Sequence, residues 1–286
     1  MNSVYLDWFT KDEQFPFFIQ YGGHDDNTFL HQHSGFSELV IVLNGHATHI
    51  VNDDTHFIKK GNVFVISGES VHAYRDPHEF KICNIMYKPE ILRAIGQDLR
   101  ISSGYQALFE IEPFYRNYHS DAATPRLCIP NLEHIFSVIS IMIEEFTNKL
   151  KGYQSMILSQ FMGLVVYLSR HYGSQVTSIP NNLMHLANTI SYIEDHYLES
   201  ITLENIANHS NISVRYLNRI FQAYYRTTPM SYLIRLRLDR ACTLLKQTRL
   251  PITDISYQCG FNDSNYFTRQ FSKVYKQSPK AYRDDH

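Results

Sequence analysis

The chain has little of what a secreted, disulfide-rich or membrane-spanning protein needs. Its 286 residues include only 4 cysteines and 1 tryptophan. Cys83, Cys128, Cys242 and Cys259 are scattered, without the Cys-x-x-Cys spacing of a zinc or redox motif. The N-terminus lacks a basic segment followed by an apolar one, and no apolar run approaches the roughly 20 residues that span a bilayer. We therefore expect a protein of the reducing cytoplasm that has no membrane partner.

Strong net charge is also absent, but the charges are unevenly distributed along the chain. The formal net charge is −2. Residues 201–283 hold 13 Lys and Arg against 4 Asp and Glu, a net charge of +9, so the remaining residues carry −11. A concentrated positive field attracts phosphates and releases their counterions. The C-terminal part is therefore predicted to bind a polyanion.

The N-terminal half has the pattern of a β domain. The chain is longer than one typical compact domain, and its 44% of apolar residues suffices for two cores. From residue 28 to about residue 87, short β-rich runs alternate with turn signals. Turns are predicted at Asn44-Gly45, at Asn52 to Asp54 and at Gly61-Asn62, the first as a hairpin. We expect an antiparallel sandwich or barrel over about residues 15–90.

The apolar period changes to that of helices between residues 131 and 172. Two segments that meet near Lys151-Gly152 are predicted to form an antiparallel helical pair. Their apolar residues exceed what one face needs, so we expect a homodimer through this pair. Packing of both faces against the rest of the same chain is the alternative. Residues 173–182, where Gly, Ser, Pro and Asn cluster, are the predicted linker.

A weak internal repeat, offset by 50 residues, marks the part of the chain after residue 183. Arg219, Phe221, Tyr225, Pro229 and Tyr232 recur as Arg269, Phe271, Tyr275, Pro279 and Tyr282. Each copy has the pattern of helix, short turn and helix, with Thr202, Ser213 and Thr253 as predicted N-caps and Gly260 in the second turn. The sequence therefore predicts an all-α domain with two helix-turn-helix units.

The second helix of each copy has a polar face opposite its apolar stripe. Arg can bond guanine bidentately, Asn and Gln can do the same to adenine, and an α-helix fits the major groove of double-stranded DNA. We therefore predict base contacts by Arg215, Asn218, Arg219 and Gln222 in the first copy, and by Ser264, Asn265, Thr268 and Arg269 in the second. A solvated helix face is the alternative for one copy alone, and the duplication disfavours it.

Residues 183–283 resemble the AraC family of bacterial regulators. The resemblance lies in the stretches ITLENIANHSNISVRYLNRIF, RLRLDRACTLL, ITDISYQCGFNDSNYFTRQF and SPKAYR. It implies a transcription activator that binds a DNA operator and contacts RNA polymerase, with the outward residues named above as base-reading positions. Members often carry Gly where this chain has Arg226 and Lys276, and Ala where it has Ser256.

The N-terminal half resembles the cupin double motif. His31 and His33 form a His-x-His pair, Glu38 follows, and His72 lies eleven residues beyond Gly61. Alternation along a strand directs both imidazoles of such a pair to one face, and neighbouring strands can bring the other two side chains beside them. Three nitrogens and a carboxylate suit Zn, Ni, Mn or Fe.

Three roles for these residues stay open: metal ligands, contacts to an organic effector, or structural histidines. Sensor cupins joined to this DNA-binding domain commonly work without metal, so the resemblance implies no required cofactor. The surrounding segment looks most like sugar-sensing members, particularly regulators of rhamnose use. A polar pocket with aromatic walls suits a small carbohydrate, so Tyr74 is predicted to contact the ligand, with Trp8, Tyr21 and Tyr87 available to line the pocket.

The combined prediction is a two-domain α+β protein that regulates transcription in response to a ligand. An antiparallel β cupin barrel with its helical pair occupies residues 1–172, and an AraC-type DNA-binding domain occupies residues 183–286. The alternatives are a cupin metalloenzyme joined to a DNA-binding module, and a regulator whose N-terminal domain only dimerises. No separate acid/base pair or nucleophile motif stands out, so an enzyme is not expected.

Overall fold

The computed structural model describes residues 2–52, 54–68, 70–93, 97–113, 127–174 and 181–285. The chain divides into two compact units, Met1–Ala187 and Asn188–His286. The predicted linker falls mostly outside the described residues, so the domain borders stay a prediction. Among the helices that are described, none has the length and apolar character needed to cross a membrane.

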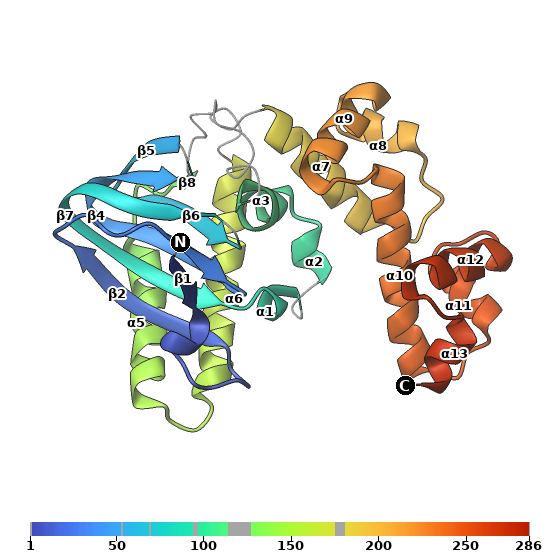
Figure 1. Cartoon of the computed structure of the whole chain (residues 1–286), viewed down its shortest axis with the longest axis horizontal. Coiled ribbons are helices and arrows are strands. Elements are labelled where there is room, and N and C mark those ends of the chain that lie inside the picture. The colour runs from blue at the N-terminus through green and yellow to red at the C-terminus, as the bar shows by residue number, and fades with distance from the viewer. Residues whose placement is uncertain are drawn as a thin grey trace. The chain divides into compact units, whose positions relative to one another are not determined.

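The first unit is built on one curved eight-stranded sheet (Figure 1). Its strands are β1 (Asn2–Tyr5), β2 (Phe17–His24), β3 (His31–Ser34), β4 (Ser37–Val51), β5 (Asp54–Lys59), β6 (Asn62–Ser67), β7 (His72–Tyr87) and β8 (Leu127–Cys128). β7 pairs with β2, β3 and β4, and β4 also pairs with β5 and β6. These pairs are antiparallel, as predicted, whereas the edge strand β1 runs parallel to β3.

The hairpin predicted at Asn44-Gly45 is wrong, because β4 runs on through both residues. Its pairing with β7 shifts register repeatedly between Val42 and Thr48. Gly45 has a φ of +65°, and a Cβ at this position would overlap the carbonyl oxygen of His78. Glycine therefore allows a bulge here instead of a turn, and the bulge bends the strand. The turns predicted near residues 52–54 and 61–62 do separate strands, since β5 begins at Asp54 and β6 at Asn62.

The interior of the curved sheet has two apolar clusters. The larger consists of Val40, Val42, Ala47, Ile58, Phe64, Ile66, Tyr74, Phe80 and Ile82. The smaller consists of Val4, Leu6, Phe36 and Met86. Buried polar side chains connect the two, because the ring of His33 lies 4.6 Å from that of Phe36 and the ring of His49 lies 5.0 Å from that of Tyr74.

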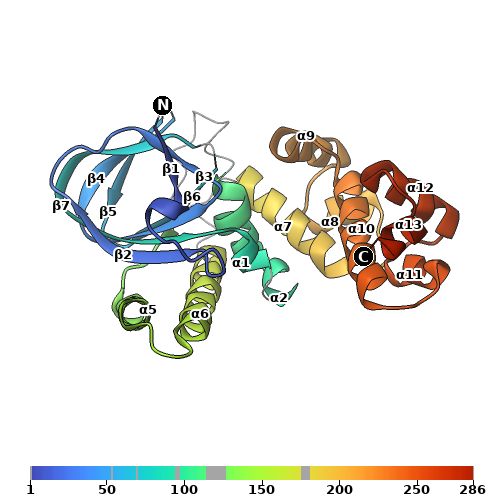
Figure 2. The same cartoon turned by 60° about the horizontal axis from the view of Figure 1, so that its bottom comes forward.

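Helices cover the opposite face of the sheet. The predicted helical pair is present as α5 (Glu133–Asn148) and α6 (Tyr153–Ser174), which lie side by side in Figures 1 and 2. Phe161 of α6 packs on Phe17 and Tyr87 of the sheet, at ring distances of 5.3 and 5.0 Å. The described part of the unit also has short helical segments: η1 (Leu6–Trp8), α1 (Glu90–Arg93), α2 (Gln97–Arg100), and α3 (Ser103–Tyr105), which continues into a π-helical segment, η2 (Gln106–Ile111).

The C-terminal part is helical and contains both predicted helix-turn-helix units (Figure 1). The helical part begins with α7 (Asn181–His196). The first helix-turn-helix unit consists of α8 (Leu203–His209) and α9 (Val214–Tyr225), and the second consists of α11 (Ile252–Gln258) and α12 (Ser264–Tyr275). α10 (Pro229–Gln247) joins them, and α13 (Pro279–Asp284) follows. Thr202 and Ser213 cap their helices as predicted. The cap predicted at Thr253 is wrong, because α11 already begins at Ile252, directly after Pro251.

Candidate functional site

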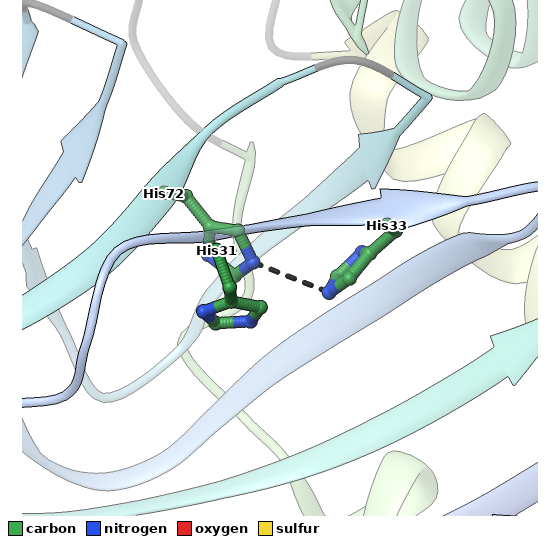
Figure 3. A group of neighbouring side chains, drawn as sticks. All are labelled: His31, His33 and His72. Atoms are coloured by element: carbon green, nitrogen blue, oxygen red, sulfur yellow. Dashed lines mark hydrogen bonds between the residues drawn. The ribbon is translucent and has the colours of Figure 1, made fainter. Parts of the chain in front are cut away.

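Four histidines and a glutamate converge in the interior of the first unit. His31 and His72 face each other across the pairing of β3 with β7, with ring centroids 4.2 Å apart. Figure 3 shows these two imidazoles with that of His33, whose Nε2 lies 3.3 Å from Nε2 of His72. On the other side of His72, its Nδ1 lies 3.3 Å from Nε2 of His49. A carboxylate oxygen of Glu38 is 3.6 Å from Nε2 of His33.

The histidine chain leaves one nitrogen free for a ligand. His49, His72 and His33 form a row joined by two nitrogen–nitrogen contacts. If the three rings are neutral and both contacts are hydrogen bonds, each ring donates in the same direction along this row. Nδ1 of His33 stands at one end, and it has no hydrogen-bond partner among the described residues. A buried polar atom without a partner is costly, so this nitrogen is a natural contact point for a bound group.

Burial removes charge from the centre of this cluster. Desolvation lowers the pKa of His33 to about 3, and the charge of His31 lowers it in the same direction. Desolvation also raises the pKa of Glu38 to about 8. The pKa of His31, which is only partly buried, is lowered for the same reason. At neutral pH, His33 is therefore a neutral imidazole and Glu38 a protonated carboxyl, each able to donate and accept hydrogen bonds.

The same geometry fits a divalent metal ion. One ring nitrogen from each of His31, His33 and His72 can be chosen so that all three lie within 4.8 Å of one another. Zn–N bonds of about 2.0–2.1 Å in a tetrahedral site place two nitrogens roughly 3.4 Å apart, close to the separation of the His33 and His72 Nε2 atoms. His49 would then accept the remaining N–H of His72, as an outer partner commonly does for a metal-bound histidine.

The aromatic residues expected near the ligand lie in different places. Tyr74 is buried beside His49 and His72, at ring distances of 5.0 and 6.0 Å. Tyr87 packs on Phe161, beneath the helices. Trp8 and Tyr21 are 64% and 50% exposed. His49 did not emerge from the sequence, whereas the structure places it in direct contact with the cluster.

In the C-terminal helical part, α9 and α12 have the composition of recognition helices, and we use that name for the pair. Each buries an apolar stripe against the domain core, with Leu217, Ile220 and Phe221 on α9 and Phe267 and Phe271 on α12. Arg215, Arg219 and Gln222 are exposed on α9, as are Asn265 and Arg269 on α12, whereas Asn218, Ser264 and Thr268 are half-buried. The side chains of Asn218 and Thr268 bond back to carbonyls of their own helices, at 3.1 and 2.9 Å.

The two helix-turn-helix units repeat each other in three dimensions. The rings of Phe221, Tyr225 and Tyr232 pack at 5.2 to 5.8 Å, and those of Phe271, Tyr275 and Tyr282 at 4.7 to 5.6 Å. Arg219 lies over the ring of Tyr216 and Arg269 over that of Tyr266. The duplication seen in the sequence is therefore a duplication of packing and of exposed chemistry.

Comparisons with known proteins agree with both halves of this description. A family model for an AraC-like ligand-binding domain matches residues 16–134, and one for a helix-turn-helix domain matches residues 206–285. The HTH-type transcriptional activator RhaR of Mannheimia succiniciproducens is 30% identical over 89% of this chain and 86% of its own length. The chain belongs to the AraC family. As a member it is a DNA-binding transcription regulator with a ligand-binding domain, and not an enzyme, as the sequence predicted.

Two further comparisons cover most of the chain and its C-terminal part, respectively. The HTH-type transcriptional activator RhaS of an Enterobacter strain is 28% identical over 89% of this chain and 87% of that protein. Among solved structures, the C-terminal domain of the response regulator YesN from Fusobacterium nucleatum is 33% identical. That match covers 33% of this chain and 93% of the solved domain, with a TM-score of 0.32.

Proposed function

We propose that the protein activates transcription from an operator that both recognition helices read, in response to a small molecule held in its N-terminal domain. The observation that supports this most directly is the matched presentation of Arg219 and Arg269, each exposed on its helix and each lying over a tyrosine three residues earlier. Matched arginines on two such helices are suited to guanine O6 and N7 in two segments of the major groove.

Selection of genomic fragments with the purified full chain, followed by titration of single-base variants of the recovered site, tests this reading. Arg219→Ala and Arg269→Ala are each expected to cost about 1–3 kcal/mol and to relax preference at one guanine, at different positions of the site. Lys280→Ala is the matched control, because an exposed lysine outside both recognition helices should weaken all sequences equally. Unchanged base preference in both arginine variants would contradict the proposal.

We propose that the effector binds at His31, His33, Glu38, His72 and Tyr74, and that it is a small carbohydrate. The neutral forms of His33 and Glu38 support this, since both can donate to and accept from sugar hydroxyls without burying a charge. Tyr74 and Phe36 supply the aromatic surface that sugar rings commonly contact. The likeness of the surrounding segment to regulators of rhamnose use points to the same class.

Isothermal titration of the full chain against rhamnose and a panel of hexoses tests the carbohydrate. Binding heat from one of them is expected to disappear in His33→Ala and His72→Ala. His46→Ala is the matched control, because His46 also lies on β4 but its ring packs on those of His78 and Phe57, near the bulge between β4 and β7. Absence of heat from every sugar, or heat that survives both cluster substitutions, would contradict this site.

The second candidate for this site is a divalent metal, held by His31, His33 and His72 with Glu38 as a fourth ligand. The 3.3 Å between the Nε2 atoms of His33 and His72 favours it. A metal would displace the Glu38 proton and could itself bind sugar hydroxyls. Metal analysis of untagged protein after dialysis against zinc decides between the two. One equivalent of metal, lost in His33→Ala, supports the metal; sugar binding that persists in chelator supports direct contacts.

We also propose that α5 and α6 form a homodimer contact and that activation involves RNA polymerase. Four apolar side chains of this helical hairpin are exposed: Phe136, Ile141, Leu150 and Met156. Sedimentation of wild type against Ile141→Asp tests the dimer, since a charge in that contact is expected to yield monomers.

Run-off transcription with purified polymerase and the selected operator tests activation, which the names of the relatives suggest.

A further inference from the structure

One arginine of α10 holds the segment between α7 and α8. The Nε of Arg237 donates to the carbonyl oxygen of Tyr197, and an Nη donates to that of Glu199, both at 2.6 Å. Because this segment ends at Thr202, the N-cap of α8, the two hydrogen bonds fix where the first helix-turn-helix unit begins. Two short hydrogen bonds from one planar guanidinium also fix its direction, which a lysine cannot do.

The same arginine contacts the turn of the second helix-turn-helix unit. Its guanidinium carbon lies 5.8 Å from the ring centre of Phe261, the residue after Gly260 in the turn between α11 and α12. Arg237 therefore contacts both the segment that leads into the first helix-turn-helix unit and the turn of the second. Its pKa is lowered because burial removes water from the guanidinium, which is consistent with a side chain held between two surfaces.

Around Arg237, the segment that leads into α8 also contacts the turn between α11 and α12 directly. Gly260 has a φ of +83°, and a Cβ there would lie 2.9 Å from the carbonyl oxygens of Tyr197 and Leu198. The two backbones therefore approach as closely as only glycine allows. Beside them, the side-chain amide of Asn262 donates to Oγ of Ser200 at 3.3 Å. α12 begins at Ser264, directly after this turn, so its start is fixed relative to the segment that leads into α8.

We propose that Arg237 is a positioning residue that sets the spacing between the two base sequences read by α9 and α12. The inference rests on the proposed function, because spacing has meaning only if both recognition helices read DNA. A step of one base pair turns the groove by about a tenth of a turn and advances it about 3.4 Å, so a rigid pair of helices tolerates only one spacing. A pair released from each other can follow the groove at neighbouring spacings.

The experiment uses the full chain and a set of operators in which one base pair is inserted or removed between the two recognised sequences. For the wild type, a change of one base pair is expected to lower affinity about tenfold or more, as loss of one recognition helix would. For Arg237→Gln, the affinity for the natural spacing should fall, and the altered spacings should be bound nearly as well as the natural one. Arg240→Gln, an exposed arginine three residues later on α10, is the charge control and should retain the wild-type spacing preference.

Folding and readout are separated by two further measurements. Circular dichroism checks that Arg237→Gln retains its helices, and Asn262→Ala loosens the same contact by a milder change if it does not. A flattened spacing profile in either folded variant supports the proposal, and a wild-type profile in both overturns it. Failure of the proposed function looks different, because the wild type itself would then lack any sequence or spacing preference.

Discussion

Arg219 lies over the ring of Tyr216, with its guanidinium carbon 4.8 Å from the ring centre, on the exposed side of α9. Arg269 has the same relation to Tyr266 on α12, at 5.8 Å. A guanidinium attracted to an aromatic face samples fewer rotamers, so less conformational entropy is lost when it binds a base. The tyrosines therefore preorganise the two arginines for which we propose guanine contacts.

Substitution of Tyr216 by leucine is expected to weaken operator binding by about 0.5–1 kcal/mol, the strength of an exposed cation–π contact. Tyr216→Phe keeps the ring and should bind like wild type. Fluorescence anisotropy over a range of salt concentrations measures both. Because no charge is lost, the slope of log affinity against log salt should not change; a shallower slope in Tyr216→Leu would mean that Tyr216 acts through phosphate contacts.

The C-terminal ends of both recognition helices are strained. Arg226 and Lys276, the residues that replace the glycine common in the family, have φ values of 53° and 61°. A left-handed conformation costs a residue with a Cβ roughly 1–2 kcal/mol. Lys276→Gly is therefore expected to stabilise the folded protein by about 1 kcal/mol, measured as a higher urea midpoint.

Lys273→Gly is the matched control for that prediction. It removes the same charge from the same helix, but Lys273 lies within α12, where glycine is about 1 kcal/mol less favourable than ordinary residues. The two glycine variants should therefore shift the midpoint in opposite directions. Destabilisation by both would show that Lys276 contributes a contact that outweighs its backbone strain.

The shifted pKa values of Glu38 and His33 predict opposite pH dependences of stability in the metal-free protein. Folded Glu38 holds its proton up to about pH 8, whereas the unfolded carboxyl loses it near 4.5. The contribution of Glu38 to the free energy of unfolding is therefore fully present below pH 4.5 and is lost as pH rises to 8. Folded His33 stays neutral down to about pH 3, whereas the unfolded imidazole gains a proton near 6.5. Its contribution is therefore lost as pH falls from 6.5 to 3.

Glu38→Gln isolates the contribution of the Glu38 carboxyl to the pH dependence of the free energy of unfolding. Relative to this variant, the wild type should lose unfolding free energy from pH 4.5 to pH 8, with a slope of at most about 1.4 kcal/mol per pH unit. Urea titrations across that range measure the difference. The exposed Glu144→Gln on α5 is the control and should follow the wild-type profile. Parallel profiles for wild type and Glu38→Gln would show that the folded carboxyl titrates normally.

The helical domain could be predicted from the sequence more completely than the sheet. Helix caps and stripes are local, so Thr202, Ser213 and the repeat at offset 50 marked both helix-turn-helix units. The contacts of Arg237 with Tyr197 and Glu199 could not be predicted, since they join segments about forty residues apart and end on backbone oxygens, which leave no trace in residue type.

In the sheet, strict alternation failed in β4 near Gly45. Val40 and Val42 of β4 face the interior, and simple alternation would then turn His49 outward. The bulge near Gly45 changes the parity, so that Ala47 and His49 are buried instead. An Asn-Gly pair marks a hairpin and a bulge equally well by composition, because both need a positive φ. His31, His33 and His72 lie on regular strand segments, and their convergence was predicted.

Gly104 and Gly163 both lie at or near α6, but they differ in what surrounds them. A Cβ on Gly104 of α3 would overlap the carbonyl oxygen of Ser169 in α6, whereas a Cβ on Gly163, in the exposed middle of α6, would meet nothing within 4 Å. Gly163→Ala should therefore stabilise the first unit by about 1 kcal/mol through helix propensity alone.

Gly104→Ala should instead destabilise by about 1–3 kcal/mol, the range for overpacking, because the obstructing atom is backbone and cannot rotate away. α3 would have to move off α6, so amide exchange should quicken at Gly104 and at Ser169, whose positions define that contact. In Gly163→Ala the same amides should keep their wild-type rates. Equal stability of the two variants would mean that α3 and α6 are not held at this separation in solution, and that the approach of their backbones does not require glycine.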